Sequence, residues 1–467
     1  MTADATVALA GQTEPPITAV SQPLIEKHGI DLIDHGERHG TARQIGMMWS
    51  GLVLNVQVVV YGALLVVFGL NWWQCVLAIL LGNLTWVLTG LCSLAGPAAG
   101  TTTFTINRAP FGHHGNRLLA LFNWVMQIGY EVLDLALMSL AAIALFGLAG
   151  VTLTTPGTVT VVLVLAVAQS LLPILGHRAI TKVLRSLIIP FTALFLVLAW
   201  LTASRLEVTA VAPGSLAVFL GGVALAASGS GLGWCPNAAD YSRYLPPTVS
   251  KKALVGWVFV GGAVPQSVLM LLGVAVAMVI PAATDPIGGL TGGYPAWFVV
   301  PYLVFVVVQM ITVNAVDLYS SGVTLQAMGI RIGRWQAVAV DGVICAVVGL
   351  MVVLSGSFNA FLGNFLLFMI VWFAPWVGVF IVDYLLRRGS YEPRLLTGGG
   401  PGFGYRGLAA QAAGMIAAAL WLNTTPFVGP LSAAAGGIDL SAPAGLLTGA
   451  LTYFLLSRRM PLSTKEI

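Results

Sequence analysis

The sequence predicts an all-α protein that crosses a membrane about twelve times. Of its 467 residues, 58% are hydrophobic and only 8% are charged, whereas soluble domains average about 45–50% apolar and about 25% charged residues. Apolar runs of about 20 residues, each long enough to span a bilayer, recur along nearly the whole chain. The basic residues are concentrated in every second connection between these runs. Together these observations predict a polytopic helical membrane protein.

The apolar runs define twelve predicted spans. They cover residues 45–69, 74–98, 117–149, 157–176, 187–203, 215–240, 253–281, 297–328, 335–354, 358–386, 407–424 and 440–457. The third and eighth spans are long, which indicates a tilt or an extension beyond the bilayer. The polar segment 1–44 has no basic stretch followed by an apolar one, so we expect no signal peptide.

The basic residues predict the orientation. With the N-terminus in the cytoplasm, every Lys and Arg except Arg205 falls on the cytoplasmic side, as the positive-inside rule requires. We therefore expect a multi-pass protein of the plasma (inner) membrane with a cytoplasmic tail at 1–44, linker at 387–406 and tail at 458–467. The net charge of +4 then reflects topology and does not indicate a nucleic-acid partner.

The local patterns predict neither a metal site nor a cofactor. The four cysteines lie in apolar runs and have neither disulfide nor zinc spacing. The glycine-rich segment 398–404 follows no predicted strand, so we interpret it as a linker and not as a phosphate loop. No nucleophile–base arrangement is visible, and we expect no enzyme.

Two spans carry interruptions. Residues 228–247 contain three alternating glycines and Pro236, and a helix there is disfavoured by about 1 kcal/mol per glycine and about 3 per proline. Span 1 carries Asn55 and Gln57 at mid-depth. Interrupted spans at corresponding places point to the binding site of a transporter built from inverted repeats. Two interrupted segments five helices apart fit two inverted repeats, 45–203 and 215–386, with broken helices 1 and 6, better than a simple bundle. The two spans at 407–457 would then lie outside these repeats.

Span 3 places four polar groups on one helix face. Asn123, Gln127, Glu131 and Asp134 follow one another at intervals of three or four residues. We interpret this stripe as facing a cavity, with interhelical hydrogen bonding as the alternative. In span 8, Asp317 is expected to contact substrate or carry a proton, because intramembrane charges are usually functional. Its alternative role is a packing carboxyl bonded to nearby serines.

Three residues are candidates for gating. Asp240 and Arg243 lie three residues apart at the end of span 6, where Arg243 suits a helix C-terminus. We interpret this pair as a cytoplasmic anchor or gate latch. Asn364 in span 10 is expected to make a helix contact or to reach a gate.

The polar groups favour a neutral, planar substrate. Side-chain amides offer a donor and an acceptor side by side, which matches a heterocycle. Trp124, Tyr130 and Trp234 offer flat faces for stacking. No basic residue is predicted at mid-membrane, so an anionic substrate would have to rely on helix N-termini.

The run GWCPNAADYSRYLP (233–246) closely resembles the signature of the nucleobase:cation symporter-1 family, the cytosine/purine permeases. Three further segments agree in the same order: GERHGTARQIGMMWSGLVLNVQ (36–57), RAPFGHHGNRLLALFNW (108–124) and NAVDLYSSGVTLQAMG (314–329). The resemblance implies the five-plus-five core with two extra helices, a substrate site among spans 1, 3, 6 and 8, and alternating access.

The resemblance also implies individual roles. Substrate contacts would fall on Gln57, Asn123, Gln127, Gly231, Trp234, Asn314 and Asp317. Sodium-coupled members use span 1 carbonyls, here from Val53, Leu54 and Val56, and paired hydroxyls of span 8. The latter positions are Thr312 and Val313 here, so one hydroxyl is replaced. We therefore favour H⁺ over Na⁺ as the coupling cation, with Glu131, Asp134 and Asp317 as proton acceptors.

The leading hypothesis is a cation-coupled importer of cytosine, a purine or a related heterocycle such as uracil, hydantoin, allantoin or a pyrimidine vitamin precursor. An amino-acid or other small-solute symporter on the same fold is the first alternative. A carboxylate substrate would favour free N–H groups at the breaks and fewer side-chain amides. A membrane sensor is the second alternative, and the short predicted tails argue against it.

Overall fold

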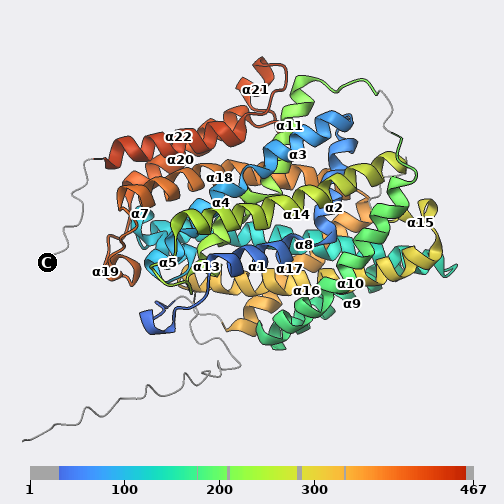
Figure 1. Cartoon of the computed structure of the whole chain (residues 1–467), viewed down its shortest axis with the longest axis horizontal. Helices are drawn as coiled ribbons and strands as arrows, with labels where there is room; N and C mark the ends of the chain where they lie inside the picture. Colours follow the sequence, from blue (N-terminus) through green and yellow to red (C-terminus); the bar gives the residue numbers. More distant parts are fainter. Residues whose placement is uncertain (1–30, 176, 208–210, 281–286, 331–332, 459–467) are drawn as a thin grey trace, which may run out of the picture.

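The computed structural model describes residues 31–175, 177–207, 211–280, 287–330 and 333–458. Most of the predicted N-terminal tail and all but one residue of the predicted C-terminal tail lie outside these ranges. Within the described part, the regular structure is helical apart from one isolated bridge between Asn423 and Val428. The long helices run side by side along the longest axis of the molecule (Figure 1).

The helices of the first half are η1 (His35–Glu37), α1 (Ala42–Val53), α2 (Val56–Val67), α3 (Trp72–Asn83), α4 (Trp86–Ser93), α5 (Ala95–Ala99), α6 (Thr103–Ile106), α7 (Arg108–Phe111), α8 (Gly115–Leu148), α9 (Thr155–Leu175) and α10 (His177–Ala203). Those of the second half are α11 (Leu216–Ser228), α12 (Gly231–Trp234), η2 (Cys235–Asn237), α13 (Ala238–Ser242), α14 (Lys251–Val279), α15 (Leu290–Gly293), α16 (Ala296–Ala327), α17 (Arg334–Ser355), α18 (Phe358–Leu386), α19 (Pro393–Leu396), α20 (Tyr405–Trp421), α21 (Pro430–Ala434) and α22 (Ser441–Ser457).

All twelve predicted spans are occupied by helix. Eight helical segments of the described residues are long and apolar enough to cross a membrane, and the bent pair α1–α2 makes a ninth. The fourth and twelfth predicted spans contain shorter apolar helices, Thr155–Leu171 and Ser441–Ser457. The eleventh corresponds to α20. The predicted all-α, polytopic fold class is therefore confirmed.

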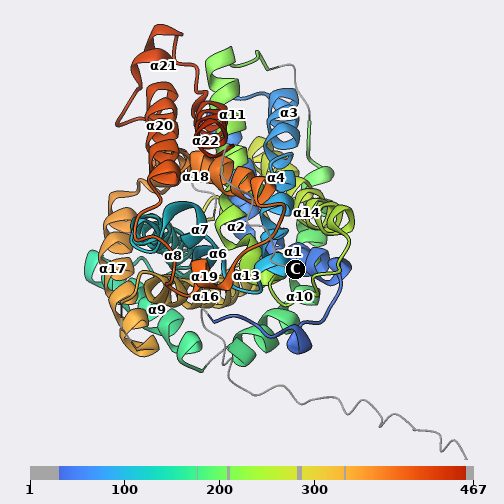
Figure 2. The same cartoon turned by 90° about the vertical axis from the view of Figure 1, so that its left-hand side faces the viewer.

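The long helices form two packed groups, and both broken spans belong to the first of them (Figure 2). In the first group, α14 packs against α1, α2, α3 and α4, while α11 packs against α3. In the second, α8, α9, α16 and α17 pack against one another. Helices α20 and α22 pack on α18 as an addition to this core. Spans 1 and 2 thus pair with 6 and 7, and spans 3 and 4 with 8 and 9, as two repeats of five helices require.

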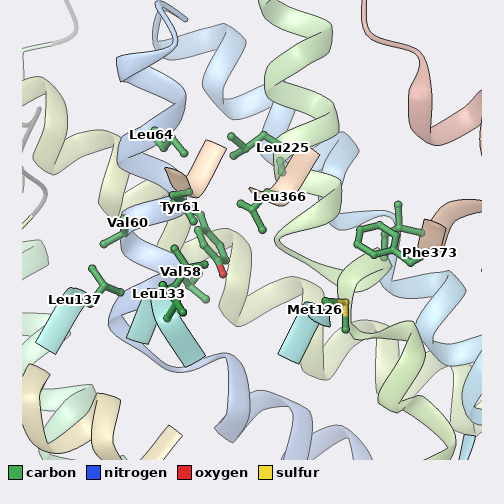
Figure 3. Packing of buried hydrophobic residues seen from close by; sticks show 14 of the residues in the cluster. Val58, Val60, Tyr61, Leu64, Met126, Leu133, Leu137, Leu225, Leu366 and Phe373 are labelled. Carbon is green, nitrogen blue, oxygen red and sulfur yellow. The ribbon is translucent and has the colours of Figure 1, made fainter. Parts of the chain in front are cut away.

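The core between the two groups is apolar. Buried side chains from α2, α8, α11 and α18 form one continuous cluster, part of which Figure 3 shows around Tyr61. Leu64 and Val60 of α2, Leu133 of α8 and Leu225 of α11 lie around this ring. Each fully buried side chain of this size stabilises the fold by about 1.5–3 kcal/mol relative to exposure in water. In a bilayer the same contacts stabilise chiefly through close packing.

Glycines allow α14 to approach α2 at backbone distance. A Cβ atom at Gly273 would overlap the carbonyl oxygen of Val59, and one at Gly62 would overlap that of Met270. Small residues at such crossings are typical of membrane helix pairs, because close packing replaces the hydrophobic effect there.

The substitution Gly273→Ala should therefore destabilise the protein by at least about 1–3 kcal/mol, the usual cost of overpacking. The measurement is the midpoint of thermal unfolding of the purified protein in detergent. Gly256→Ala in the same helix is the control, since nothing lies within 4 Å of a Cβ atom there. Equal midpoints for the two variants would contradict the close approach of α14 to α2.

Candidate functional site

The predicted break in span 6 is present. Helix α11 ends at Ser228, and Ser230 has non-helical angles (φ −123°, ψ −137°) before α12 begins at Gly231. Neighbouring helices satisfy the freed carbonyls: Gln266 Nε2 donates to Gly229 O at 2.7 Å, and Thr89 Oγ1 donates to Gly231 O at 2.6 Å. A helix break at membrane depth is stable under this condition, because no water is available to the backbone.

Span 1 is broken as well. Helices α1 and α2 meet at an angle of 62°, and Asn55 between them is extended (φ −141°, ψ 163°). The Asn55 amide supports both halves, since Nδ2 donates to Leu52 O at 2.9 Å and Oδ1 accepts from Val58 N at 3.1 Å. The interruption predicted from Asn55 and Gln57 is therefore confirmed.

A cavity of about 520 Å³ lies between the two breaks. Its walls come from α1 and α2, α8, the region from the end of α11 to η2, and α16. The lining residues are Val53, Asn55, Gln57, Val58, Tyr61, Met126, Gln127, Tyr130, Gly229, Gly233, Trp234, Asn237, Val313 and Asp317.

The polar part of the cavity wall consists of side-chain amides, two tyrosine hydroxyl groups and one carboxyl group. Gln57 Nε2 is buried and has no hydrogen-bond partner among the described residues. Gln127 Nε2 makes only a long bond of 3.4 Å to Asn237 Oδ1. Asp317 is the only charged residue in the described lining. The wall therefore offers donors and acceptors to a neutral ligand and provides no basic partner for an anion.

Neighbouring aromatic rings pack against the aromatic residues of the cavity wall. The Trp234 ring packs edge-on against Trp49, with centroids 5.4 Å apart. Trp49 in turn contacts Trp86 and Tyr241 in the same manner. Tyr130 is held edge-on by Phe365 at 5.1 Å. Edge-to-face pairs of this kind fix the orientation of the rings.

The structure brings four of the seven predicted substrate residues to the cavity wall, namely Gln57, Gln127, Trp234 and Asp317. The other three do not line it. Asn123 Nδ2 donates to Thr324 Oγ1 at 3.0 Å, which ties α8 to α16. Asn314 donates to Gln169 on α9, and Gly231 packs against the backbone of Trp86 in α4.

The predicted proton acceptors of span 3 lie behind the cavity. Glu131 and Asp134 are fully buried in α8. Glu131 Oε2 accepts from Cys345 Sγ at 3.2 Å, while neither carboxyl oxygen of Asp134 has a hydrogen-bond partner among the described residues. Asp341 of α17 is also fully buried, and its Oδ1 accepts from Trp124 Nε1 at 3.1 Å. Trp124, which was expected to offer a face for stacking, instead bonds to Asp341 and is not among the described lining residues of the cavity.

The candidate sodium ligands lie on both sides of the span 1 break and on α16. Thr312 Oγ1 donates to Val308 O of its own helix at 2.7 Å. The Val56 N–H donates to Gln309 Oε1 at 3.0 Å. Val53 lines the cavity at the end of α1.

The gate candidates lie at helix ends. Asp240 Oδ1 accepts from Thr103 N at 2.7 Å and so joins α13 to the start of α6. The Arg243 guanidinium lies over the Tyr244 ring, 5.1 Å from its centroid. Asn364 Oδ1 accepts from Thr425 N at 3.1 Å, which joins α18 to the connection after α20.

Sequence reasoning did not identify Tyr61, Asn237 and Gln309 as site residues. Tyr61 follows Gln57 by one helical turn, so the shared helix face was a usable signal. Asn237 lies inside the motif run at 233–246. The pairing of Gln309 with the span 1 break joins residues far apart in the chain and left no local pattern.

Known proteins resemble this chain over most of its length. A putative purine-cytosine permease YxlA of Bacillus subtilis (strain 168) is 26% identical over 454 residues, covering 93% of this chain and 96% of the relative. The purine-cytosine permease fcyB of Emericella nidulans is 24% identical over 464 residues, covering 92% of this chain and 88% of the relative.

Solved structures share the fold. The inward-facing conformation of Mhp1 superposes with a TM-score of 0.72 at 18% identity, covering 94% of this chain and 96% of that protein. A closed conformation of Mhp1, described as a nucleobase-cation-symport-1 family transporter with bromovinylhydantoin bound, gives a TM-score of 0.66 at 19% identity over 93% of this chain and 96% of that protein. Residues 32–445 match the model of the permease family for cytosine/purines, uracil, thiamine and allantoin, and the chain therefore belongs to that family.

Proposed function

We propose that this protein is a secondary active transporter that imports a nucleobase, cytosine or a purine, by cation symport with alternating access. The observation that supports this most directly is the cavity between two broken spans, whose polar wall is built from side-chain amides, two tyrosine hydroxyl groups and one carboxyl group. Such a cavity suits a neutral heterocycle with donors and acceptors on its edge. The printed names of the relatives agree with this substrate class.

In this proposal the ring of the substrate stacks on Trp234, and its edge bonds to Gln57 and Gln127. Base–aromatic stacking contributes about 1–3 kcal/mol. Asn123, Asn314 and Gly231 support the cavity from behind by joining its walls to α16, α9 and α4. A related heterocycle such as uracil, allantoin or a hydantoin is the alternative substrate, since the same edge chemistry applies. An amino acid is disfavoured, because the described lining offers its carboxylate no basic side chain.

For the coupling cation we propose a proton. Asp317 lines the cavity, and Glu131 and Asp134 lie buried behind it without a basic partner in the described structure. A buried charge without a partner is costly, whereas a protonated carboxyl group is not. Binding a proton together with the substrate would therefore make the carboxyl group that accepts it neutral for the crossing.

We further propose that both termini are cytoplasmic and that the protein resides in the plasma (inner) membrane. The distribution of Lys and Arg supports this orientation. The repeats 45–203 and 215–386 each contribute helices to both groups, and the two groups would then move against each other around the cavity. Asp240 and Arg243 would act at its cytoplasmic end as part of the inner gate, and Asn364 at the opposite end.

Uptake measurements on the purified protein in proteoliposomes test the proposed function. Labelled cytosine, adenine and leucine are offered separately, each with and without an inward proton or sodium gradient. We expect gradient-driven accumulation of at least one nucleobase and no uptake of leucine. Leucine uptake without uptake of any heterocycle would reject the proposal in favour of an amino-acid symporter.

A further inference from the structure

The break in span 1 frees two backbone groups that a continuous helix would pair. Leu54 (φ −80°, ψ 68°) and Asn55 leave the helical conformation between α1 and α2. The Leu54 carbonyl and the Val56 N–H therefore lack helical partners. In transporters with broken helices, carbonyls at such breaks typically coordinate the coupling cation.

One side chain satisfies both groups here. Gln309 Nε2 donates to Leu54 O at 3.0 Å, and Gln309 Oε1 accepts from Val56 N at 3.0 Å. Gln309 belongs to α16 and is only 5% exposed. An amide has a donor and an acceptor side by side, so this single neutral group joins the two halves of span 1 to span 8.

Three backbone carbonyl oxygens at this junction already accept hydrogen bonds from side chains. Leu52 O accepts from Asn55 Nδ2 at 2.9 Å, and Leu54 O accepts from Gln309. One turn along α16, Val308 O accepts from Thr312 Oγ1 at 2.7 Å. A cation at this junction would compete with these donors, because one of the two lone pairs of each carbonyl oxygen already faces a hydrogen.

We propose that the Gln309 amide takes the place of a coupling cation between the span 1 break and span 8, so that this junction needs no sodium ion. Gln309 is then a positioning residue: it does what the cation would do, which is to hold the broken helix against α16. A second cavity, of about 510 Å³, adjoins the amide and is lined by residues of both helices, Leu54 and Asp317 among them. The role of Gln309 in transport rests on the proposed function, whereas the tests below measure stability and need no transport assay.

The first test is the midpoint of thermal unfolding of the wild-type protein, measured without substrate in sodium chloride and in choline chloride at equal ionic strength. We expect the same midpoint in both salts. A saturable rise of more than about 2 °C with sodium would indicate a bound ion and would overturn the proposal.

The second test uses two variants of the same residue. Gln309→Glu keeps the acceptor for Val56 N but sets a carboxylate oxygen against Leu54 O, and the two oxygens repel each other unless a cation lies between them. We expect sodium to raise the midpoint of this variant at alkaline pH. Gln309→Leu removes both bonds without adding charge, so its midpoint should fall equally in both salts.

These outcomes are independent of transport. If Gln309→Glu folds but neither sodium nor acidic pH raises its midpoint of thermal unfolding, the amide does not take the place of a cation, and the proposal is rejected. If that variant does not fold, the wild-type comparison alone decides. Nucleobase uptake together with sodium stabilisation would reject this inference and keep the proposed function. If the unfolding midpoint does not depend on the salt and no heterocycle is taken up, this inference is kept and the proposed function is rejected.

Discussion

Replacing Gln57 with Leu is expected to raise the KM for nucleobase uptake by about 10- to 100-fold. The two side chains are similar in volume, but leucine can make no hydrogen bond. Gln57 Nε2 is buried at the cavity wall without a partner in the described structure, so a bound substrate would satisfy it. Leaving the matching group of the substrate unpaired in a dry cavity costs about 1–3 kcal/mol, which corresponds to this loss of affinity.

The measurement is initial uptake against substrate concentration in proteoliposomes. Gln411→Leu is the control, because Gln411 is also buried but its Nε2 bonds to Trp372 O, between α20 and α18 and away from the described cavity lining. An unchanged KM in the control would show that removing a buried amide alone has no effect. An unchanged KM in Gln57→Leu would remove Gln57 from the substrate site.

The sequence was sufficient to locate the spans and both breaks, because these features depend on local chemistry. Apolar runs of membrane length specify a helix wherever they occur. Glycine and proline at 229–236, and Asn55 in span 1, disfavour a continuous helix regardless of neighbours. The structure confirms helix in every predicted span and a break at both places.

It was harder to predict which polar side chains line the cavity and which contact a neighbouring helix. Asn123, Gln127, Glu131 and Asp134 share a face of α8 by their spacing, yet among them only Gln127 lines the cavity. Periodicity says which residues lie together on a helix, but the neighbouring helices decide what each one meets. Asn123 meets Thr324 of α16, and Glu131 meets Cys345 of α17.

The two groups of helices suggest how coupling could work. The cavity is lined from both groups: Gln57 and Trp234 belong to the first, and Gln127 and Asp317 to the second. A ligand that bonds to both groups favours the arrangement in which they are close together. A proton on Asp317 changes the same interface, because it alters the charge of the second group where it meets the first.

Asp317→Asn should therefore abolish accumulation against a gradient while leaving exchange of substrate across the membrane. Asparagine keeps the size and the hydrogen-bonding capacity of a protonated aspartic acid, but it cannot take up or release a proton. With one proton per substrate, each pH unit is worth about 1.4 kcal/mol, or about tenfold accumulation. The wild type should show this response to an inward proton gradient, and the variant should stop at equal concentrations.

Other titratable groups interact electrostatically with Asp317, namely Tyr61, Tyr130, Glu131, Asp134 and Tyr241. If Asp317→Asn still accumulates substrate with the wild-type pH profile, the coupling proton binds to Glu131 or Asp134 instead. The variants Glu131→Gln and Asp134→Asn then show which of these two residues binds it. Asp439→Asn is the matched control, because that carboxyl group is buried but bonds to Asn423 N and Ser441 near α22. Its gradient response should equal that of the wild type, since Asp439 has no place at the interface that the proton is proposed to control.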